Sequence, residues 1–412
     1  MRNRNRPTVL EVRLGATVVG SLTNLPNDQN LFVFDPAYLA DPQRPTLSLS
    51  FYDAYQAVQT AVRPVTGKLP PFFSNLLPEG RLRQYIAERG EIHAEREFFL
   101  LWLLGRDLPG GVTVQDPDQG ALPPALDRPG VVRRRAGKDV LRFSLAGVQL
   151  KLSAIGNPAR QLSIPASSVG GHWIVKLPSP LYPGLPENEY SMMEFARAVG
   201  IEVPEVGLLP LQEIDGIPAE WAQLPGSAYY VRRFDRGAKG HRIHMEDFNQ
   251  VYGQFPGAKY QNYSYTNMAM DLWRLTDAAQ FAEFVRRLVF HAGIGNMDMH
   301  LKNWSLLYAD GRTPRLAPAY DFVSTVCYMP DDRMALSIAR EKRTGALSVE
   351  LLRKFAGKAA VPTVLVLTTA QETVAAMRAV WPRLQKELPL TRVMRQRISA
   401  QMKSVPLFAA AG

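Results

Sequence analysis

The stretch Val289–Tyr308, VFHAGIGNMDMHLKNWSLLY, constrains the fold of this chain more than any other segment. An apolar run with helical periodicity ends at Gly293 and Gly295. A polar loop, Asn296–Asn303, follows, and the apolar segment Trp304–Tyr308 then has the composition of a strand. We therefore expect a loop that is anchored by a helix on one side and by a strand on the other, which suits side chains that must be held in place.

Two residues of this loop have the spacing of a catalytic site. Asp298 and Asn303 form Asp-x-x-x-x-Asn, the spacing of a protein-kinase catalytic loop, in which the Asp accepts the substrate hydroxyl proton and the Asn holds a metal ion. His300 has no second histidine three or four residues away, which favours support of the loop over a metal site. Lys302 is either a phosphate ligand or a surface lysine.

Charged residues on both sides of the loop extend this interpretation. Lys176 ends the apolar segment HWIVKLP, and burying a lysine is costly unless it meets an anion. In kinases such a lysine pairs with nucleotide phosphates and a helix glutamate, and Glu189 on the next predicted helix is the expected partner. Asp321, in AYDFV, follows the loop where a kinase needs a second metal ligand.

Two further segments are open to two interpretations each. Gly147, in SLAGVQLK, permits a turn whose amides face a phosphate, although in isolation an ordinary hairpin is the better explanation. Arg233 and Asp235 form either an ion pair at a strand end or part of a segment, Arg232–Phe234, whose backbone binds adenine.

The order of predicted elements indicates an α+β chain with a protein-kinase-like, two-lobed fold. We expect a small α+β subdomain over residues 1–115, a linker over 116–139, a nucleotide-binding lobe over 140–236 and a helical catalytic lobe over 237–412. In the first subdomain we expect a hairpin at Val9–Leu22, strands at Leu31–Phe34, Thr46–Phe51 and Gly110–Gln115, and helices at Leu77–Arg89 and Glu95–Leu104.

The second half of the chain changes from strands to helices. The predicted strands are Leu141–Leu145, Gln149–Ala154, Gln161–Ile164, Trp173–Leu177, Val206–Leu209 and Ala228–Phe234. The predicted helices are Glu189–Val199 with Asn188 as a possible N-cap, Glu246–Tyr252, Ala278–Ala292, Val349–Phe355, Val364–Val380 ended or kinked by Pro382, and Thr391–Met402. We expect the whole chain after Asp331 to be helical.

Composition excludes several classes of protein. The single cysteine, Cys327, excludes an intramolecular disulfide framework and a cysteine-based zinc site. The apolar cluster Phe98–Leu104 is too short to span a bilayer, so we expect a cytoplasmic protein without a membrane partner. The formal net charge of +10 suits contact with nucleic acid, nucleotide or an acidic protein.

Taken in order, these blocks resemble the HipA family, the serine/threonine-kinase toxins of bacterial type II toxin–antitoxin modules. The similar stretches are FFSNLLPEGRLR, LLGRD, FSLAGVQLKLS, HWIVKLP, ENEYSMMEFARAVGIEVPE, YYVRRFDR, EDFNQVYG with AKYQ, GNMDMHLKNWSLL and LAPAYDF. The resemblance implies ATP and Mg²⁺ as cofactors, a helix-turn-helix HipB-like antitoxin, operator DNA bound through that complex, and an aminoacyl-tRNA synthetase as a possible substrate.

The resemblance also implies roles for individual residues. Asp298 would be the catalytic base, Asn303 and Asp321 the metal ligands, and Ser144 an autophosphorylated serine whose modification inactivates the enzyme. The residues expected to contact the nucleotide are Ala146, Gly147, Val148, Gln149, Leu150 and Lys151 of a phosphate loop, Lys176, Glu189, Arg232, Arg233, Phe234, His300, Lys302, Asn303, Tyr320 and Asp321.

Two other functions are weighed against an active kinase. A vestigial kinase fold could serve as a corepressor in a complex with DNA, which the net charge permits, yet none of the required acidic or lysine positions is lost. A phosphohydrolase using Asp298 lacks the paired acidic or histidine clusters that such metal sites usually need.

Overall fold

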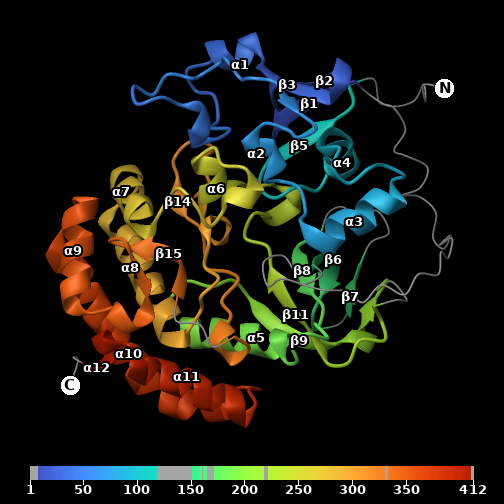
Figure 1. Ribbon diagram of the computed structural model, residues 1–412. Helices are drawn as coiled ribbons and strands as arrows, with labels where there is room; N and C mark the ends of the chain where they lie inside the picture. Colours follow the sequence, from blue (N-terminus) through green and yellow to red (C-terminus); the bar gives the residue numbers. More distant parts are fainter. Residues whose placement is uncertain are drawn as a thin grey trace.

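The computed structural model describes residues 8–117, 151–159, 161–164, 171–217, 221–329 and 333–409. Within these ranges the chain is α+β, with four mainly antiparallel sheets and helices between and after their strands (Figure 1). The predicted fold class is confirmed. The division of the chain at residues 115, 139 and 236 stays a prediction.

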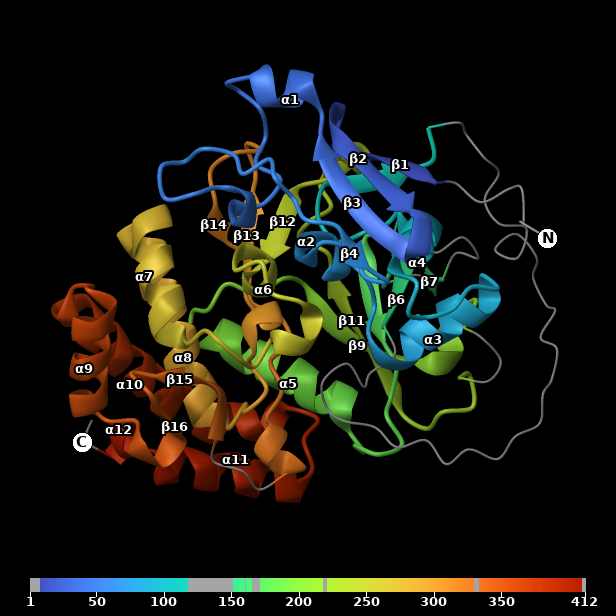
Figure 2. The same ribbon diagram turned by 45° about the horizontal axis from the view of Figure 1, so that its top comes forward.

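A twisted five-stranded sheet forms the N-terminal unit, which we define as residues 8–117. Its order is β4-β3-β2-β1-β5, and Figure 2 shows it at the top of the molecule with α2 and α4 beneath it. Alternate residues of β1 (Leu10, Val12 and Leu14) are buried on the face toward these helices. The elements are β1 Val9–Leu14, β2 Thr17–Leu25, β3 Gln29–Phe34, α1 Pro36–Ala40, β4 Val65–Thr66, α2 Pro71–Ser74, α3 Gly80–Arg89, α4 Glu97–Leu104 and β5 Val112–Gln115.

A second sheet contains the strand that ends at Lys176. Its order is β10-β7-β6-β8-β11-β9, and α5 packs against β9 and β11. The positive φ of Gly200, just beyond α5, ends this helix without the steric cost that a side chain would bring. The elements are β6 Lys151–Asn157, β7 Gln161–Ser163, β8 Trp173–Lys176, α5 Leu185–Ala198, β9 Val206–Pro210, β10 Ile214–Asp215 and β11 Ser227–Arg232.

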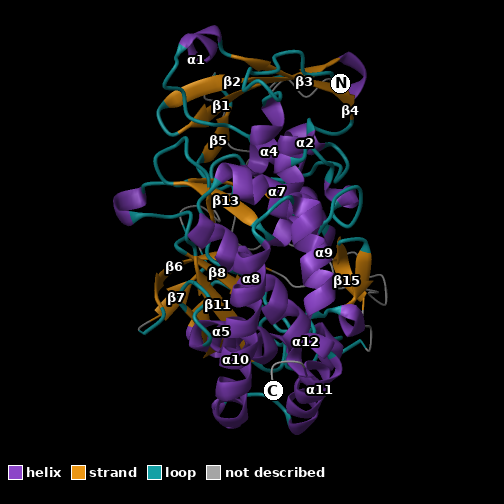
Figure 3. Cartoon of the chain, turned by 90° about the vertical axis from the view of Figure 1, so that its left-hand side faces the viewer, coloured by secondary structure: helices purple, strands orange, loops and turns teal. Residues whose placement is uncertain are grey.

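The remaining elements are mostly helices, of which α10, α11 and α12 lie at the end of the molecule opposite the N-terminal unit (Figure 3). A small sheet, β12-β13-β14, lies between the two regions. The elements are β12 His244–Asp247, α6 Phe248–Val251, α7 Tyr265–Leu275, α8 Ala278–Ile294, β13 Ser305–Tyr308, β14 Arg315–Leu316, β15 Arg333–Ile338, β16 Glu341–Arg343, α9 Val349–Ala359, α10 Thr363–Glu387, α11 Arg392–Ser404 and α12 Pro406–Ala409.

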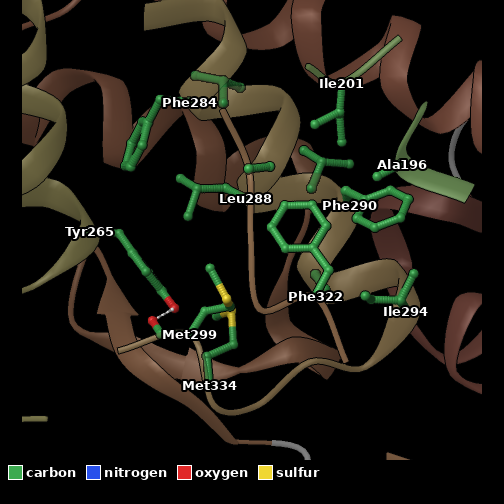
Figure 4. Packing of buried hydrophobic residues seen from close by; sticks show 14 of the residues in the cluster. Ala196, Ile201, Tyr265, Phe284, Leu288, Phe290, Ile294, Met299, Phe322 and Met334 are labelled. Carbon is green, nitrogen blue, oxygen red and sulfur yellow. Dashed lines mark hydrogen bonds between the residues drawn. The ribbon is translucent and has the colours of Figure 1, made fainter. Parts of the chain in front are cut away.

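The largest core surrounds α8. Leu288 and Phe290 on α8 lie beside Phe322, the residue after the predicted metal ligand (Figure 4). Met299, in the predicted catalytic loop Asn296–Asn303, is buried in the same core, and its carbonyl accepts a 2.7 Å hydrogen bond from Tyr265 on α7 (Figure 4). Apolar packing therefore fixes the loop from beneath, because a close-packed interior resists displacement.

Several sequence-based predictions of single elements are wrong. Thr46–Phe51 is not a strand, because Ser48 caps a 3₁₀ turn at Leu49–Phe51 and the Leu49 amide bonds the Glu246 carboxylate. The helix predicted at Glu246–Tyr252 begins two residues later than predicted, at Phe248, because Glu246 is in β12 and Asp247 caps α6 with a capping box.

Three further predictions fail towards the C-terminal end. Asn188 lies inside α5, whose N-cap is Gly184. Residues 333–343 form a hairpin and not a helix, since Ala339 and Arg340 adopt the positive φ angles of a tight turn. The helix α10 runs through the exposed Pro382, so the alternative that this proline ends the helix is wrong, and the alternative that it kinks the helix stays a prediction. The predicted strand Leu141–Leu145 lies outside the described residues.

Among the described residues, no helix combines the length and apolar character needed to cross a bilayer.

Candidate active site

The catalytic loop lies between a helix and a strand, as predicted. The helix α8 ends at Ile294, and Gly295 turns the chain with a left-handed φ of 66°. The Asn296 amide donates to the His291 carbonyl at 2.9 Å, which closes the helix end in a Schellman-type arrangement. The chain then passes through a 3₁₀ turn at Leu301–Asn303 and enters β13.

The Asp298 carboxylate is held by a neighbour that sequence reasoning did not find. The Tyr260 hydroxyl donates a 2.5 Å hydrogen bond to Asp298 Oδ1. Asn303 Nδ2 donates to the Asp298 carbonyl at 3.0 Å, so the two residues of the predicted pair do meet. Burial raises the pKa of Asp298 against the opposing effect of the tyrosine bond. A raised pKa suits a group that accepts a proton during the reaction.

A buried asparagine connects this loop with the segment after it. Asn296 Oδ1 accepts from the Asp298 amide at 3.1 Å, and its Nδ2 donates to the Asp321 carbonyl at 3.4 Å. One side chain thus joins the backbones of the predicted base and the predicted metal ligand. The sequence offers a signal for this role only in the placement of a polar residue at the end of α8.

Lys176 is buried at the end of β8 between two carboxylates. Its Nζ donates to Glu189 Oε1 on α5 at 2.5 Å and forms a second, short contact with Asp321 Oδ1. Burial disfavours the lysine charge, but Asp321 and Glu189 outweigh this effect and raise its pKa. Burial likewise opposes ionisation of Asp321, yet Lys151 and Lys176 hold its pKa well below the usual range. The expected lysine–glutamate pair is present, and the lysine is not the exposed residue that its strand-end position alone suggests.

The backbone at Asp321 is unusual for a residue with a side chain. Its φ is 59°, in the left-handed region that aspartate tolerates better than most residues. Three residues on, the Ser324 backbone amide and carbonyl both bond the Asn188 side chain of α5, at 2.9 and 3.1 Å. Because Asn188 precedes Glu189 in α5, this pair of hydrogen bonds fixes the helix that carries Glu189 to the segment that carries Asp321. Strain of this kind persists where neighbours hold it.

Two further loop residues, His300 and Lys302, form no hydrogen bond to Glu189 or Asp321 among the described residues. His300 is buried, burial lowers its pKa to about 3, and its Nδ1 has no hydrogen-bond partner. Its ring meets Tyr260 edge-on, in agreement with a supporting role. Lys302 Nζ is 2.9 Å from Glu79 Oε1, so the lysine faces the N-terminal unit.

The predicted hinge has one exposed and one buried arginine. Arg232 is exposed and lies 3.6 Å from Glu205, whereas Arg233 is buried against Asp235 and Asp107. The expected Arg233–Asp235 pair is therefore present. The third hinge residue, Phe234, packs on Tyr320 with ring centroids 5.7 Å apart. Whether this backbone receives adenine stays a prediction.

Part of the predicted site lies outside the described residues. These residues are Ser144, Ala146, Gly147, Val148, Gln149 and Leu150. The last member of the predicted phosphate loop, Lys151, begins β6, and its Nζ is 3.4 Å from Asp321 Oδ2.

The donor set fits a magnesium ion. Asp321 offers carboxylate oxygens, and Asn303 keeps its amide oxygen as an acceptor because its Nδ2 bonds Asp298. Mg²⁺ prefers oxygen ligands, and it commonly takes one or two from protein and the rest from water and phosphates. The described residues contain no group of three or more acidic, histidine or cysteine side chains that could hold a metal ion.

Comparison with known families matches both halves of the chain. The HipA N-terminal domain matches residues 10–115, and the HipA-like C-terminal domain matches residues 143–381. The chain belongs to the HipA family. Among HipA-family relatives, the Sinorhizobium fredii protein Y4dM, which is named as a candidate kinase, is 48% identical over 404 residues, covering 97% of this chain and 98% of the relative.

Two comparisons with Shewanella oneidensis extend this placement. Its serine/threonine-protein kinase toxin HipA is 23% identical over 394 residues, covering 87% of this chain and 85% of the toxin. The solved structure of HipA with HipB and its operator DNA aligns with a TM-score of 0.71 at 21% identity, covering 98% of this chain and 96% of that one. This similarity shows that the chain has the HipA fold.

Proposed function

We propose that the protein transfers the γ-phosphate of ATP to a serine hydroxyl of a protein, with Mg²⁺ as the required ion. One observation carries the proposal: Lys176 is buried between the carboxylates of Glu189 and Asp321, which are far from each other in the sequence. A buried lysine held in this way is a preorganised cation for phosphate oxygens. The names of the kinase relatives support the same reaction.

In this reaction Asp298 accepts the proton of the substrate hydroxyl. The hydroxyl oxygen forms a bond to the γ-phosphorus as the bond from that phosphorus to the bridging oxygen of ADP breaks. Asn303 and Asp321 would hold Mg²⁺, which would neutralise charge on the transferred group. Asp321 contacts two lysines, so we expect at least one of them to move to the phosphates when nucleotide and metal bind.

The direct test is phosphate transfer from γ-labelled ATP by purified protein. Wild type is expected to label itself or a protein substrate, and Asp298→Gln is expected to lose transfer while retaining ATP binding. Asp310→Asn is the control, because Asp310 lies in an exposed turn after β13. Transfer by Asp298→Gln at the wild-type rate contradicts the assignment of the base.

We further propose that the protein acts as a toxin that is neutralised by a helix-turn-helix antitoxin of the HipB kind, which carries the pair to operator DNA. The solved relative was found with HipB and operator DNA, which supports these partners. An aminoacyl-tRNA synthetase is the proposed substrate, with arrest of translation as the result. Labelling a bacterial lysate with wild type and Asp298→Gln, followed by identification of the labelled proteins, tests the substrate.

Autophosphorylation of Ser144 is proposed as the inactivating step. A phosphoserine adds nearly two negative charges beside residues meant for ATP phosphates. Mass spectrometry after incubation with ATP and Mg²⁺ should find phosphate on this serine. Its absence under conditions that phosphorylate a substrate removes the idea.

The second candidate function is a corepressor with little catalytic activity. The operator complex of the structural relative and the net charge of +10 favour it. Such a scaffold has no need of nucleotide, so a measurement of ATP affinity separates the two functions.

A further inference from the structure

A glutamate of the N-terminal unit pairs with two lysines beside the catalytic loop. Glu79 precedes α3 but makes no capping bond to that helix. Its Oε2 lies 2.8 Å from Lys259 Nζ and its Oε1 lies 2.9 Å from Lys302 Nζ. The lysine side chains are 8% and 14% exposed and the Glu79 side chain is 29% exposed, so these pairs are partly shielded from solvent, unlike ordinary surface ion pairs.

One of these lysines, Lys259, precedes the residue that contacts the proposed catalytic base. The Lys259 carbonyl accepts from the Leu301 amide of the loop at 3.2 Å. The next residue, Tyr260, donates to Asp298 Oδ1 and packs edge-on against His300. Two consecutive residues therefore touch Glu79 on one side and Asp298 on the other.

A second residue of the N-terminal unit holds the chain just before this pair. Asn75 Nδ2 donates to the Gln254 carbonyl at 2.8 Å, and its Oδ1 accepts from Asn249 Nδ2 at 2.9 Å. Asn249 in turn donates to the carbonyls of Gln254 and Phe255, at 3.1 and 3.0 Å. The N-terminal unit thus anchors the segment 254–260 at both ends.

We propose that Glu79 and Asn75, acting through Lys259 and Tyr260, position the carboxylate of Asp298, so that phosphoryl transfer depends on the N-terminal unit. This inference rests on the proposed kinase function. The tyrosine bond occupies Oδ1 of the carboxylate and sets its rotation, which leaves Oδ2 for the substrate hydroxyl. Glu79 and Asn75 are positioning residues, since they reach the base only through the segment 254–260.

The experiment measures phosphate transfer, KM for ATP and ATP affinity in full-length protein. The variants are Tyr260→Phe, Glu79→Gln and their combination, with Glu88→Gln, an exposed position on α3, as the matched control. We expect kcat to fall by about tenfold or more in Tyr260→Phe, because misplacing a reacting group by about 1 Å is enough for such losses. Glu79→Gln should lower kcat less, and KM and ATP affinity should stay within about twofold of wild type because Lys176 is untouched.

The double variant decides whether Glu79 acts through the tyrosine. If it does, the combination has the kcat of Tyr260→Phe alone, because effects along one chain of contacts are not additive. Independent, multiplied losses, or losses of ATP affinity and thermal stability that match the loss of kcat, indicate a general structural role and overturn the proposal.

The two levels of inference fail differently. Unchanged kcat in Tyr260→Phe, measured against an active wild type, overturns the positioning role alone. A wild type that binds ATP but transfers no phosphate to itself or to any lysate protein overturns the proposed function, and the positioning role with it.

Discussion

Replacing Gly295 with alanine tests how the catalytic loop is held against the segment after Asp321. Gly295 has a φ of 66°, and a Cβ there would lie 2.5 and 2.7 Å from the two Cγ atoms of Val326 and 3.0 Å from Gln401 Cγ. The left-handed conformation costs an alanine about 1 kcal/mol relative to glycine. Overpacking against Val326 and Gln401, which are both half-buried, adds about 1–3 kcal/mol. The expected loss of unfolding free energy is therefore about 2–4 kcal/mol.

Gly200 supplies the matched control for the cost of placing an alanine in the left-handed backbone conformation. It follows α5 with a φ of 83°, and a Cβ there would meet nothing within 4 Å. Gly200→Ala should therefore lose only the conformational cost of about 1 kcal/mol. The assay is urea unfolding of the three proteins, compared by their midpoints and slopes.

A second substitution separates the steric effect from all others. Val326→Ala removes the two Cγ atoms that the new Cβ meets. The double variant Gly295→Ala with Val326→Ala should be more stable than Gly295→Ala alone, although each single change destabilises the wild type. Equal losses for Gly295→Ala and Gly200→Ala, or no recovery in the double variant, refute the reasoning.

Three further expectations follow from the site and its surroundings. Asn188→Ala should lose about 1–3 kcal/mol of stability and weaken ATP binding, because the buried Ser324 amide loses its acceptor and the Ser324 carbonyl keeps only the Cys327 amide as donor; urea unfolding and nucleotide titration measure this. Burial lowers the pKa of His244 to about 4 while its ring bonds the Leu47 carbonyl. The unfolded chain therefore takes up this proton first as the pH falls below about 6.5, and wild type should lose about 2 kcal/mol more than His244→Gln between pH 7 and 5, as read from urea midpoints. Asp321→Asn keeps a side chain that tolerates the left-handed backbone but removes the charge, so transfer should need much more Mg²⁺ while the fold survives; a magnesium titration of the rate checks this.

The part of the site that could be predicted from sequence is the part with short spacings. Asp298 and Asn303 are five positions apart in one loop, and the structure brings them into contact. Lys176 and Glu189 are separated by 13 positions, one strand end and one helix turn. Separations of this size lie within one loop or between two consecutive elements, so periodicity and loop length determine whether the side chains meet.

The remaining contacts depend on how separate units pack, which no local pattern encodes. Tyr260 reaches Asp298 across 38 positions, and Glu79 reaches Lys259 across 180. The same physics explains the wrong strand at Thr46–Phe51. Its apolar–polar alternation is typical of a strand, but its backbone bonds distant groups, including the Gly311 carbonyl and the Glu246 carboxylate. Tertiary context overrides local preference where a segment serves an interface.

That interface gives the N-terminal unit a place in the chemistry and not only in the fold. Glu246 of β12 accepts hydrogen bonds from Ser48 at 2.6 Å and from Tyr308 of β13 at 2.5 Å. The Ser48 bond joins the N-terminal unit to the small sheet. Burial raises the pKa of Glu246 to about 7, a cost that these donors only partly offset. A buried acid of this kind favours one docking geometry, because any other arrangement removes the Ser48 and Leu49 donors and leaves only Tyr308, which lies on the neighbouring strand. If Glu79 positions Asp298 through the same docking, residues 143–381 alone contain every predicted ligand of ATP and Mg²⁺ and still lack a fully positioned base.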